Sequence, residues 1–258
     1  MCYDAVSAAR SILKYAVHRG ESPESIEELQ RELEQLEILF NEPKYYVSGF
    51  SHPKLLVFTN EKPFTPQAFT WGLIPEWVKE KKQALQLANQ TLNARVESIF
   101  EKPSYRSSAR HKRCLVYLDA FYEHFHQGGK TFPFHISMKD ESPLAVAGLW
   151  SEWVNKETGE IISTVSIVTT RGNEIMQRIH NNPKAEGPRM PLILPKEMQN
   201  EWLIPFEGDQ TKIRLMQLAE PFDASLMKAH PVKRLKGKEA IGNIPEAEEK
   251  FAYPDIDY

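Results

Sequence analysis

The second residue of the chain is a cysteine, and this position could give it unusual chemistry. A residue as small as Cys2 allows the initiator Met1 to be removed, which leaves a free α-amine beside the thiol. The α-amine has a pKa of about 7.7–8.0 and the thiol of about 8.5, so both groups are usable near neutral pH. An aldehyde that meets this pair forms an imine, which the thiol closes to a thiazolidine. Position alone nevertheless favours a chance cysteine at a frayed chain end.

Glu123 is a candidate for proton transfer because it stands between two aromatic residues. On an extended chain Phe121, Glu123 and Phe125 share one face. Burial among aromatic rings would raise the pKa of this carboxyl and suit it to acid–base work. The strand could equally be turned over, so that Glu123 meets solvent. His124 and His126 share the opposite face, but no further ligands accompany them, so we expect no metal site.

Two further sites could contribute polar groups. His180 follows a short helix predicted over residues 173–179, and the helix dipole at that end favours a cationic imidazole, as a general acid requires. Asn93 and Arg95 lie two apart, so an extended chain directs both to one side. An amide beside a guanidinium suits a carbonyl-like group next to a phosphate. Each signal is weak in isolation, since a lone histidine is more often structural.

The elements that must position these residues begin with a clear helix over Pro23–Phe40. Ser22 precedes Pro23 as a predicted N-cap, with proline at the first helical position. Apolar residues recur at three- and four-residue steps, and acids fill the opposite face. Residues 21–42 hold eight acids and one arginine, a charge of 1 − 8 = −7. We interpret residues 22–42 as an acidic helical insertion.

Beyond this helix, five runs rich in β-branched and aromatic residues predict strands, at residues 55–59, 114–120, 132–138, 144–150 and 161–169. Short turns rich in glycine, asparagine and proline separate the later runs, which favours antiparallel pairing. A further helix is predicted over residues 196–203. The pattern predicts an α+β fold with a mainly antiparallel, barrel-like β-sheet core and peripheral helices, in a single domain over residues 1–258.

Composition excludes several classes of protein. The chain has 258 residues, a net charge of −3 and two cysteines, which argues against a disulfide framework and favours a reducing cytoplasm. It holds no apolar run long enough to span a membrane, and its start lacks the pattern of a secretory signal. Two basic clusters, residues 102–113 and 228–238, contain no acid and could attract phosphates, although such clusters are commonly solvated faces.

Taken together, these residues resemble the SOS-response-associated peptidase (SRAP) family of abasic-site processing proteins. The resemblance follows the family's order over nearly the whole chain and reverses the interpretation of Cys2 as a chance residue. It is carried by Met1-Cys2, Trp71-Gly72-Leu73-Ile74-Pro75, Asn93-Ala94-Arg95-Val96-Glu97, Phe121-Tyr122-Glu123-His124, Ala147-Gly148-Leu149-Trp150, Val168-Thr169-Thr170 leading into His180, Arg189-Met190-Pro191, His230-Pro231-Val232 and Gly242-Asn243.

The resemblance implies an enzyme that binds single-stranded DNA at abasic sites during the SOS response to DNA damage. It implies that Cys2, after removal of Met1, traps the sugar aldehyde as a thiazolidine and so forms a covalent DNA–protein crosslink. By the same analogy Asn93 orients the adduct, Glu123 moves the proton that opens the sugar ring, and His180 acts as acid and base. No metal and no cofactor is expected, and the protein would be cytoplasmic and nucleoid-associated on damage.

The resemblance also implies the groups that contact DNA. Arg95 and Arg189 look like phosphate binders, and Trp71 looks like part of the surface that accommodates flanking bases. Stacking on such a ring contributes about 1–3 kcal/mol per base.

The sequence departs from the family pattern in several places. Asp4 stands where an arginine is usual, so a phosphate contact is lost or moved. Residues 45–50 replace the usual Tyr-Asn-x-Ala-Pro loop, and residues 181–188 look like a local addition before Arg189. Protein partners are not indicated by the sequence.

The sequence leaves two alternative functions open. The first is an N-terminal-nucleophile cysteine peptidase, in which Cys2, Glu123 and His180 hydrolyse an amide, including the bond to Met1; abasic-site lyase activity is a related outcome. The second is a noncatalytic single-stranded DNA-binding module that uses Trp71 and the basic clusters, whose binding would be fully reversible by salt.

Overall fold

A computed structural model describes residues 3–7, 12, 13, 16, 22–40, 45–205, 209–254 and 256 of the chain. Cys2, on which much of the expected chemistry depends, therefore lies outside the described residues. Within the described part, every helix is too short or too polar to cross a lipid bilayer.

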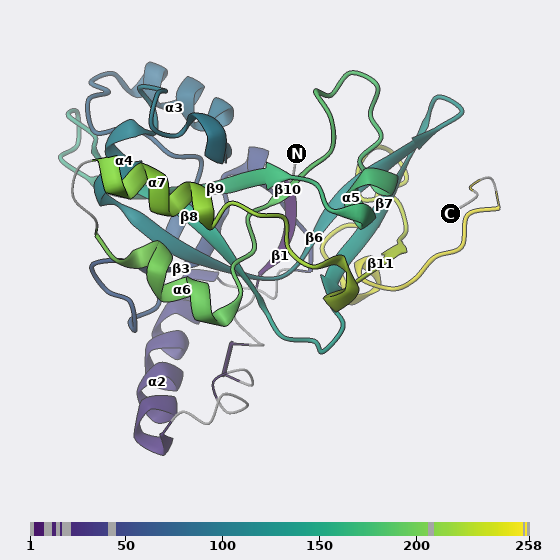
Figure 1. Ribbon diagram of the computed structural model, residues 1–258, viewed down its shortest axis with the longest axis horizontal. Coiled ribbons are helices and arrows are strands. Elements are labelled where there is room, and N and C mark those ends of the chain that lie inside the picture. Colours follow the sequence, from purple (N-terminus) through teal and green to yellow (C-terminus); the bar gives the residue numbers. More distant parts are fainter. Residues whose placement is uncertain are drawn as a thin grey trace.

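The centre of the fold is a closed barrel of β3 (Lys54–Thr59), β4 (Gln67–Trp71), β6 (Arg113–Gln127), β8 (Leu144–Val154) and β9 (Ile161–Arg171). Neighbouring strands pair antiparallel, except that β4 runs parallel to β9. Helices lie around the outside (Figure 1). The predicted α+β class with a mainly antiparallel, barrel-like core is therefore confirmed.

Strand β6 is longer than its sequence predicts, and its extension decides where Glu123 lies. Its first part pairs with β8, and its second part pairs with β7 (Lys130–Met138), where Glu123 faces Phe134 across the ladder. Gly128 and Gly129 join β6 to β7 with φ angles of 58° and 73°, a conformation that glycine adopts without steric cost. Glu123 thus belongs to a regular strand and not to a loop.

Short strands complete the sheet around the ends of the barrel strands. β1 (Asp4–Ser7) pairs with β6 and with β2 (Val47–Ser48), and β11 (Met227–Pro231) pairs with β7. β5 (Asn93–Arg95) and β10 (Arg189–Pro191) both pair with β9. The sequence did not predict these strands, because two to five residues carry too little periodicity to be recognised.

The helices confirm the strongest local predictions. α2 spans Pro23–Phe40, and Ser22 Oγ accepts the backbone N–H of Ser25 at 3.2 Å, so the predicted cap is present. α5 (Glu174–Ile179) and α6 (Lys196–Leu203) also match their predictions. The other α-helices in the described part of the chain are α3 (Lys81–Gln90), α4 (Arg106–His111) and α7 (Asp209–Gln217). Leu29 and Leu33 bury the apolar side of α2, which projects below the barrel in Figure 1.

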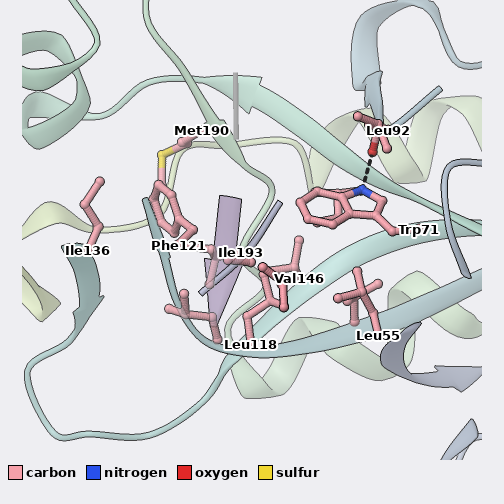
Figure 2. Close-up of a cluster of buried hydrophobic side chains, with 14 of the residues drawn as sticks. Leu55, Trp71, Leu92, Leu118, Phe121, Ile136, Val146, Met190 and Ile193 are labelled. Carbon is pink, nitrogen blue, oxygen red and sulfur yellow. Dashed lines mark hydrogen bonds between the residues drawn. The ribbon is translucent and has the colours of Figure 1, made fainter. Parts of the chain in front are cut away.

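The hydrophobic core fills the barrel and extends beneath the second half of β6. Figure 2 shows the Trp71 ring directed among Leu55 and Val146, and the Met190 side chain directed toward Phe121. Leu55, Trp71, Phe121, Val146 and Met190 all belong to one buried cluster. Met190 precedes Pro191 on β10 and Phe121 lies two residues before Glu123, so this packing fixes β10 against the end of β6.

Candidate active site

Glu123 and His180 meet in a buried pair. Oε2 of Glu123 lies 3.2 Å from Nδ1 of His180, and the two residues are 7% and 6% exposed. Glu123 comes from β6, and His180 is the C-cap residue of α5, where its backbone N–H donates to the carbonyl of Met176. Two residues 57 positions apart are thus held in hydrogen-bond contact, as an acid–base pair requires.

The environment holds the pKa of Glu123 below its usual value. Burial acts to raise this pKa, but hydrogen bonds from His180 and from the backbone N–H of His124, with the charge of His180, lower it by more. This corrects the expectation of a raised pKa, which counted desolvation and not the partners. Glu123 is therefore a carboxylate at neutral pH and begins a reaction as a proton acceptor.

His180 is placed by backbone contacts as well as by Glu123. Its Nδ1 lies 3.3 Å from the carbonyl oxygen of Arg189 and 3.4 Å from the backbone nitrogen of the same residue. The helix that precedes it is anchored by Met176 and Ile179, which are fully buried, and by Asn173, whose side chain accepts the N–H of Met176. The imidazole is therefore fixed in orientation before any substrate binds.

The first described residues of the chain lie beside this pair. Asp4 on β1 pairs with Tyr122, the residue before Glu123, and the carbonyl of Tyr3 accepts the N–H of Gly49 at 2.7 Å. Cys2, which is joined to Tyr3 by one peptide bond, lies outside the described residues. The described chain thus begins next to the Glu123–His180 pair.

Asp4, where the resemblance led us to expect an arginine, is buried and forms contacts within the protein. It is 2% exposed, its Oδ2 accepts Nζ of Lys236 at 2.7 Å, and its Oδ1 accepts the hydroxyl of Tyr46 at 3.2 Å. Burial, with the adjacent charge of Asp4, raises the pKa of the Tyr46 hydroxyl. The cluster joins β1 to the C-terminal segment, a role that sequence reasoning missed because its members are more than 40 and 230 residues apart.

Asn93 and Arg95 occupy β5, which runs parallel to β9. Asn93 pairs with Ile167 and Arg95 with Thr169, and both residues are partly buried. The carbonyl of Asn93 accepts the Tyr105 hydroxyl at 3.0 Å. Burial raises the pKa of that hydroxyl to about 12, so Tyr105 remains a hydrogen-bond donor. The strand pairing therefore directs the two predicted residues to one side, as expected for an extended segment.

Arg95 and Arg189 lie on opposite flanks of β9, since β5 and β10 both pair with that strand near Thr169. Each guanidinium contacts a carboxylate. Arg189 is bonded to Glu97 through two nitrogens at 2.8 and 2.9 Å and to the carbonyl of Thr169 at 2.8 Å, while Arg95 contacts Glu186. The Arg189 side chain is only 11% exposed, so most of its surface is already covered.

Trp71 does not occupy the surface that the sequence led us to expect. It is 0% exposed, and its Nε1 donates to the carbonyl of Leu92 at 2.8 Å (Figure 2). A ring enclosed in the core cannot stack on a base, so this predicted DNA contact is corrected to a structural role. The alternation along β4, which directs Phe69 and Trp71 inward together, explains the result.

Parts of the two basic clusters are also structural. Arg113 is fully buried and donates to the carbonyls of Trp202, Ala109, Arg110 and Ile204. Lys236 contacts Asp4, and Arg234 contacts Glu239 at 3.0 Å. Formal charge counts along the sequence therefore overstate the positive charge that these clusters offer to a phosphate. Among the described residues, no group of three or more His, Cys, Asp and Glu side chains could hold a metal ion.

A mixed β-barrel and a buried carboxylate–imidazole pair beside β1 define the fold and the site of this protein, and comparison with known proteins gives the family. The family model described as SOS response associated peptidase (SRAP) matches residues 15–238. The chain therefore belongs to the SRAP family. The matched region includes Asn93, Glu123 and His180 and begins after Cys2.

Several relatives extend this result. The abasic site processing protein YoqW of Bacillus subtilis is 39% identical over 166 residues, which cover 64% of this chain and 68% of that protein. The abasic site processing protein HMCES of Xenopus tropicalis is 27% identical, and the match covers 65% of this chain but 50% of the longer relative. A crystal structure of a protein from Bacteroides thetaiotaomicron superposes with a TM-score of 0.80 at 32% identity, over 97% of this chain and 100% of that one.

Proposed function

We propose that this protein processes abasic sites in single-stranded DNA by forming a covalent thiazolidine crosslink through Cys2, after Met1 has been removed. The observation that carries the proposal is the buried contact between Glu123 and His180 at 3.2 Å, beside a strand that begins two residues after Cys2. The names of the relatives, which are abasic site processing proteins, support the same substrate.

The chemistry needs a base and a proton relay, and the pair supplies both. Glu123, held as a carboxylate, accepts the proton of the C1 hydroxyl of the sugar as the bond between C1 and the ring oxygen breaks. It returns this proton to the ring oxygen, which becomes a hydroxyl, and C1 becomes the aldehyde carbon. The α-amine of Cys2 then attacks the carbonyl carbon, and loss of one water gives an imine. The Cys2 thiol adds to the imine carbon, and its proton passes to the nitrogen through the Glu123–His180 pair. One C–N bond and one C–S bond form, and one water leaves.

The remaining predicted residues position the strand. Asn93 holds the sugar adduct through its amide. Arg95 and Arg189, on either flank of β9, neutralise phosphates, with Arg95 the more accessible of the two because its side chain is 36% exposed. The open-chain aldehyde is converted to a thiazolidine before the DNA strand can be cleaved. This reaction protects the abasic site and does not cut the strand.

The test is incubation with a single-stranded oligonucleotide that carries one abasic site, followed by a denaturing gel and intact mass spectrometry. We expect a heat-stable adduct whose mass equals protein without Met1 plus DNA minus one water. Cys2→Ala should abolish it. The matched control is Cys114→Ala, which removes a buried free thiol and should leave the adduct intact. A strand with a tetrahydrofuran site, which has no aldehyde, should give no adduct. An adduct formed by Cys2→Ala would overturn the proposal.

The alternative of an N-terminal-nucleophile peptidase uses the same residues and is distinguished by its product. It predicts amide hydrolysis, including release of Met1, that requires Glu123 and needs no DNA. If Glu123→Gln retains Met1 when expressed in cells and purified protein cleaves peptides, the peptidase reading gains support. If Met1 is absent from that variant as well, cellular aminopeptidases are sufficient to remove it, and Glu123 is not required for this step.

A further inference from the structure

The loop of residues 181–188 connects two residues of the candidate site, His180 and Arg189. Figure 1 shows this loop, between α5 and β10, projecting from the sheet. Its first residue is fixed by two bonds to β6: the Asn181 amide accepts the N–H of His126 at 2.7 Å and donates to the carbonyl of the same residue at 2.9 Å. At its other end the Pro188 carbonyl accepts the N–H of Gly172 at 2.9 Å. The loop is therefore held at both ends.

The middle of the loop places a carboxylate on one of the two arginines. Glu186 contacts the guanidinium of Arg95, although the two residues are 91 positions apart and come from different elements. The hydrogen bond and charge of Arg95 hold the pKa of Glu186 below its usual value, with a smaller contribution from Lys102. The carboxylate thus occupies a hydrogen-bonding position on Arg95 that is also suited to an anionic phosphate oxygen.

The two arginine–carboxylate pairs around β9 differ in how readily they can open. Glu97 binds Arg189 through two parallel hydrogen bonds, and Arg189 is also bonded to Thr169 and largely covered, so this pair opens less readily. Glu186 is 77% exposed, and it contacts Arg95 from a loop. An exposed pair of this kind contributes little stability, and a phosphate can displace its carboxylate at low cost.

We propose that Glu186 is a specificity-determining residue that competes with DNA phosphate for Arg95. In the free protein it neutralises the more accessible arginine, and binding of a strand requires its displacement. Intact single strands are therefore held weakly, and stable retention depends on the covalent step at an abasic site. The inference rests on the proposed function in taking DNA as the ligand, but it concerns reversible binding and not the crosslink.

The size of the effect follows from the exposure of the pair. We expect Glu186→Gln to bind intact single-stranded DNA about two- to fivefold more tightly, in line with the weak coupling of exposed ion pairs. Removing the internal competitor also leaves one more cation to be neutralised by phosphate. The slope of log affinity against log salt concentration should therefore steepen by about 0.7, the value for one additional contact to a single strand.

The experiment is fluorescence anisotropy with the full-length protein and an undamaged fluorescent oligonucleotide across a salt series. Glu101→Gln is the matched control, because this variant also removes one negative charge from an exposed ion pair. The Glu101 side chain is 69% exposed and contacts Lys212 at 3.8 Å. We expect the gain for Glu186→Gln to exceed that of Glu101→Gln and to disappear in an Arg95→Gln background. Equal effects of the two variants, or a gain that persists without Arg95, would overturn the proposal.

The outcome is separable from that of the proposed function. The undamaged strand has no aldehyde, so the binding measurement is independent of Cys2 chemistry. A protein that shows the Glu186 effect but forms no adduct with an abasic strand would refute the crosslinking mechanism and leave the competition at Arg95 standing. A protein that crosslinks but shows no specific Glu186 effect would support the crosslinking mechanism and refute the competition at Arg95.

Discussion

Nζ of Lys236 lies 2.7 Å from Oδ2 of Asp4, which ties the C-terminal segment to the strand that begins two residues after Cys2. The carboxylate is buried while the lysine is half exposed. A buried charge is stable only with a partner, so this contact makes the position of β1 depend on a residue 232 positions away.

Removal of that partner should destabilise the protein. We expect Lys236→Met to lower the free energy of unfolding by about 1–3 kcal/mol, because Asp4 then stays buried without the charge of its lysine partner. Urea denaturation measures the loss. Asp4→Asn combined with Lys236→Met should recover most of it, since the uncompensated charge is then gone. Lys238→Met, at an exposed position of the same segment, is the control and should change stability little. If Lys236→Met and Lys238→Met are equally stable, the Asp4–Lys236 pair does not have the stabilising role given to it.

Glu123 should control the rate of crosslinking and not the affinity for DNA. Glu123→Gln keeps the size of the side chain but cannot accept a proton, so we expect the single-turnover rate at saturating protein to fall by about 10²- to 10⁴-fold. His180→Gln should be similarly slow. Because the two groups act through one hydrogen bond, the double variant should be little slower than either single one. Multiplicative losses would show that the residues act independently.

His135 should make the protein sensitive to acid. Burial, with the nearby charges of His230 and Lys228, lowers the pKa of His135 to about 3 from 6.5. Between pH 6.5 and 3, His135 is therefore protonated in the unfolded chain but not in the folded protein. The free energy of unfolding falls as the pH drops below 6.5 toward 3. At pH 5 the loss from this group is about 2 kcal/mol.

Thermal or urea unfolding between pH 7 and pH 5 measures this dependence. His135→Gln should flatten it, whatever its effect at pH 7. The control is His111→Gln, at an exposed position, which should keep the slope of the unsubstituted protein. If the slopes of all three proteins agree, another group is responsible for the acid sensitivity.

Trp71 should act through stability alone. We expect Trp71→Ala to cost about 3–5 kcal/mol, since it empties a large space in the core. Trp71→Phe retains most of the apolar volume and loses the bond to the Leu92 carbonyl, so it should cost less. The affinity of the folded Trp71→Phe variant for intact single-stranded DNA should equal that of the unsubstituted protein. A clear loss of affinity at unchanged stability would restore the stacking role that the structure contradicts.

The sequence by itself determined the elements whose signals are local. The helix Pro23–Phe40 was predicted with its boundaries and cap, because its apolar stripe, Ser22 and Pro23 all act within a few residues. The short helix that ends before His180 followed from similar signals. The fold class followed from strands separated by short turns, and the family from motifs in a fixed order.

Tertiary structure alone decided how these pieces meet. β4 and β5 run parallel to β9, which no turn signal could indicate, because parallel neighbours are not joined by a hairpin. The same holds for charge: the pKa of Glu123 falls and not rises, because His180 arrives from 57 residues away. Strand pairing and burial also sent Trp71 to the core and placed Glu186 on Arg95. Such contacts depend on the packing of segments that are distant in the sequence. A single sequence gives the residues but does not show which of them are in contact.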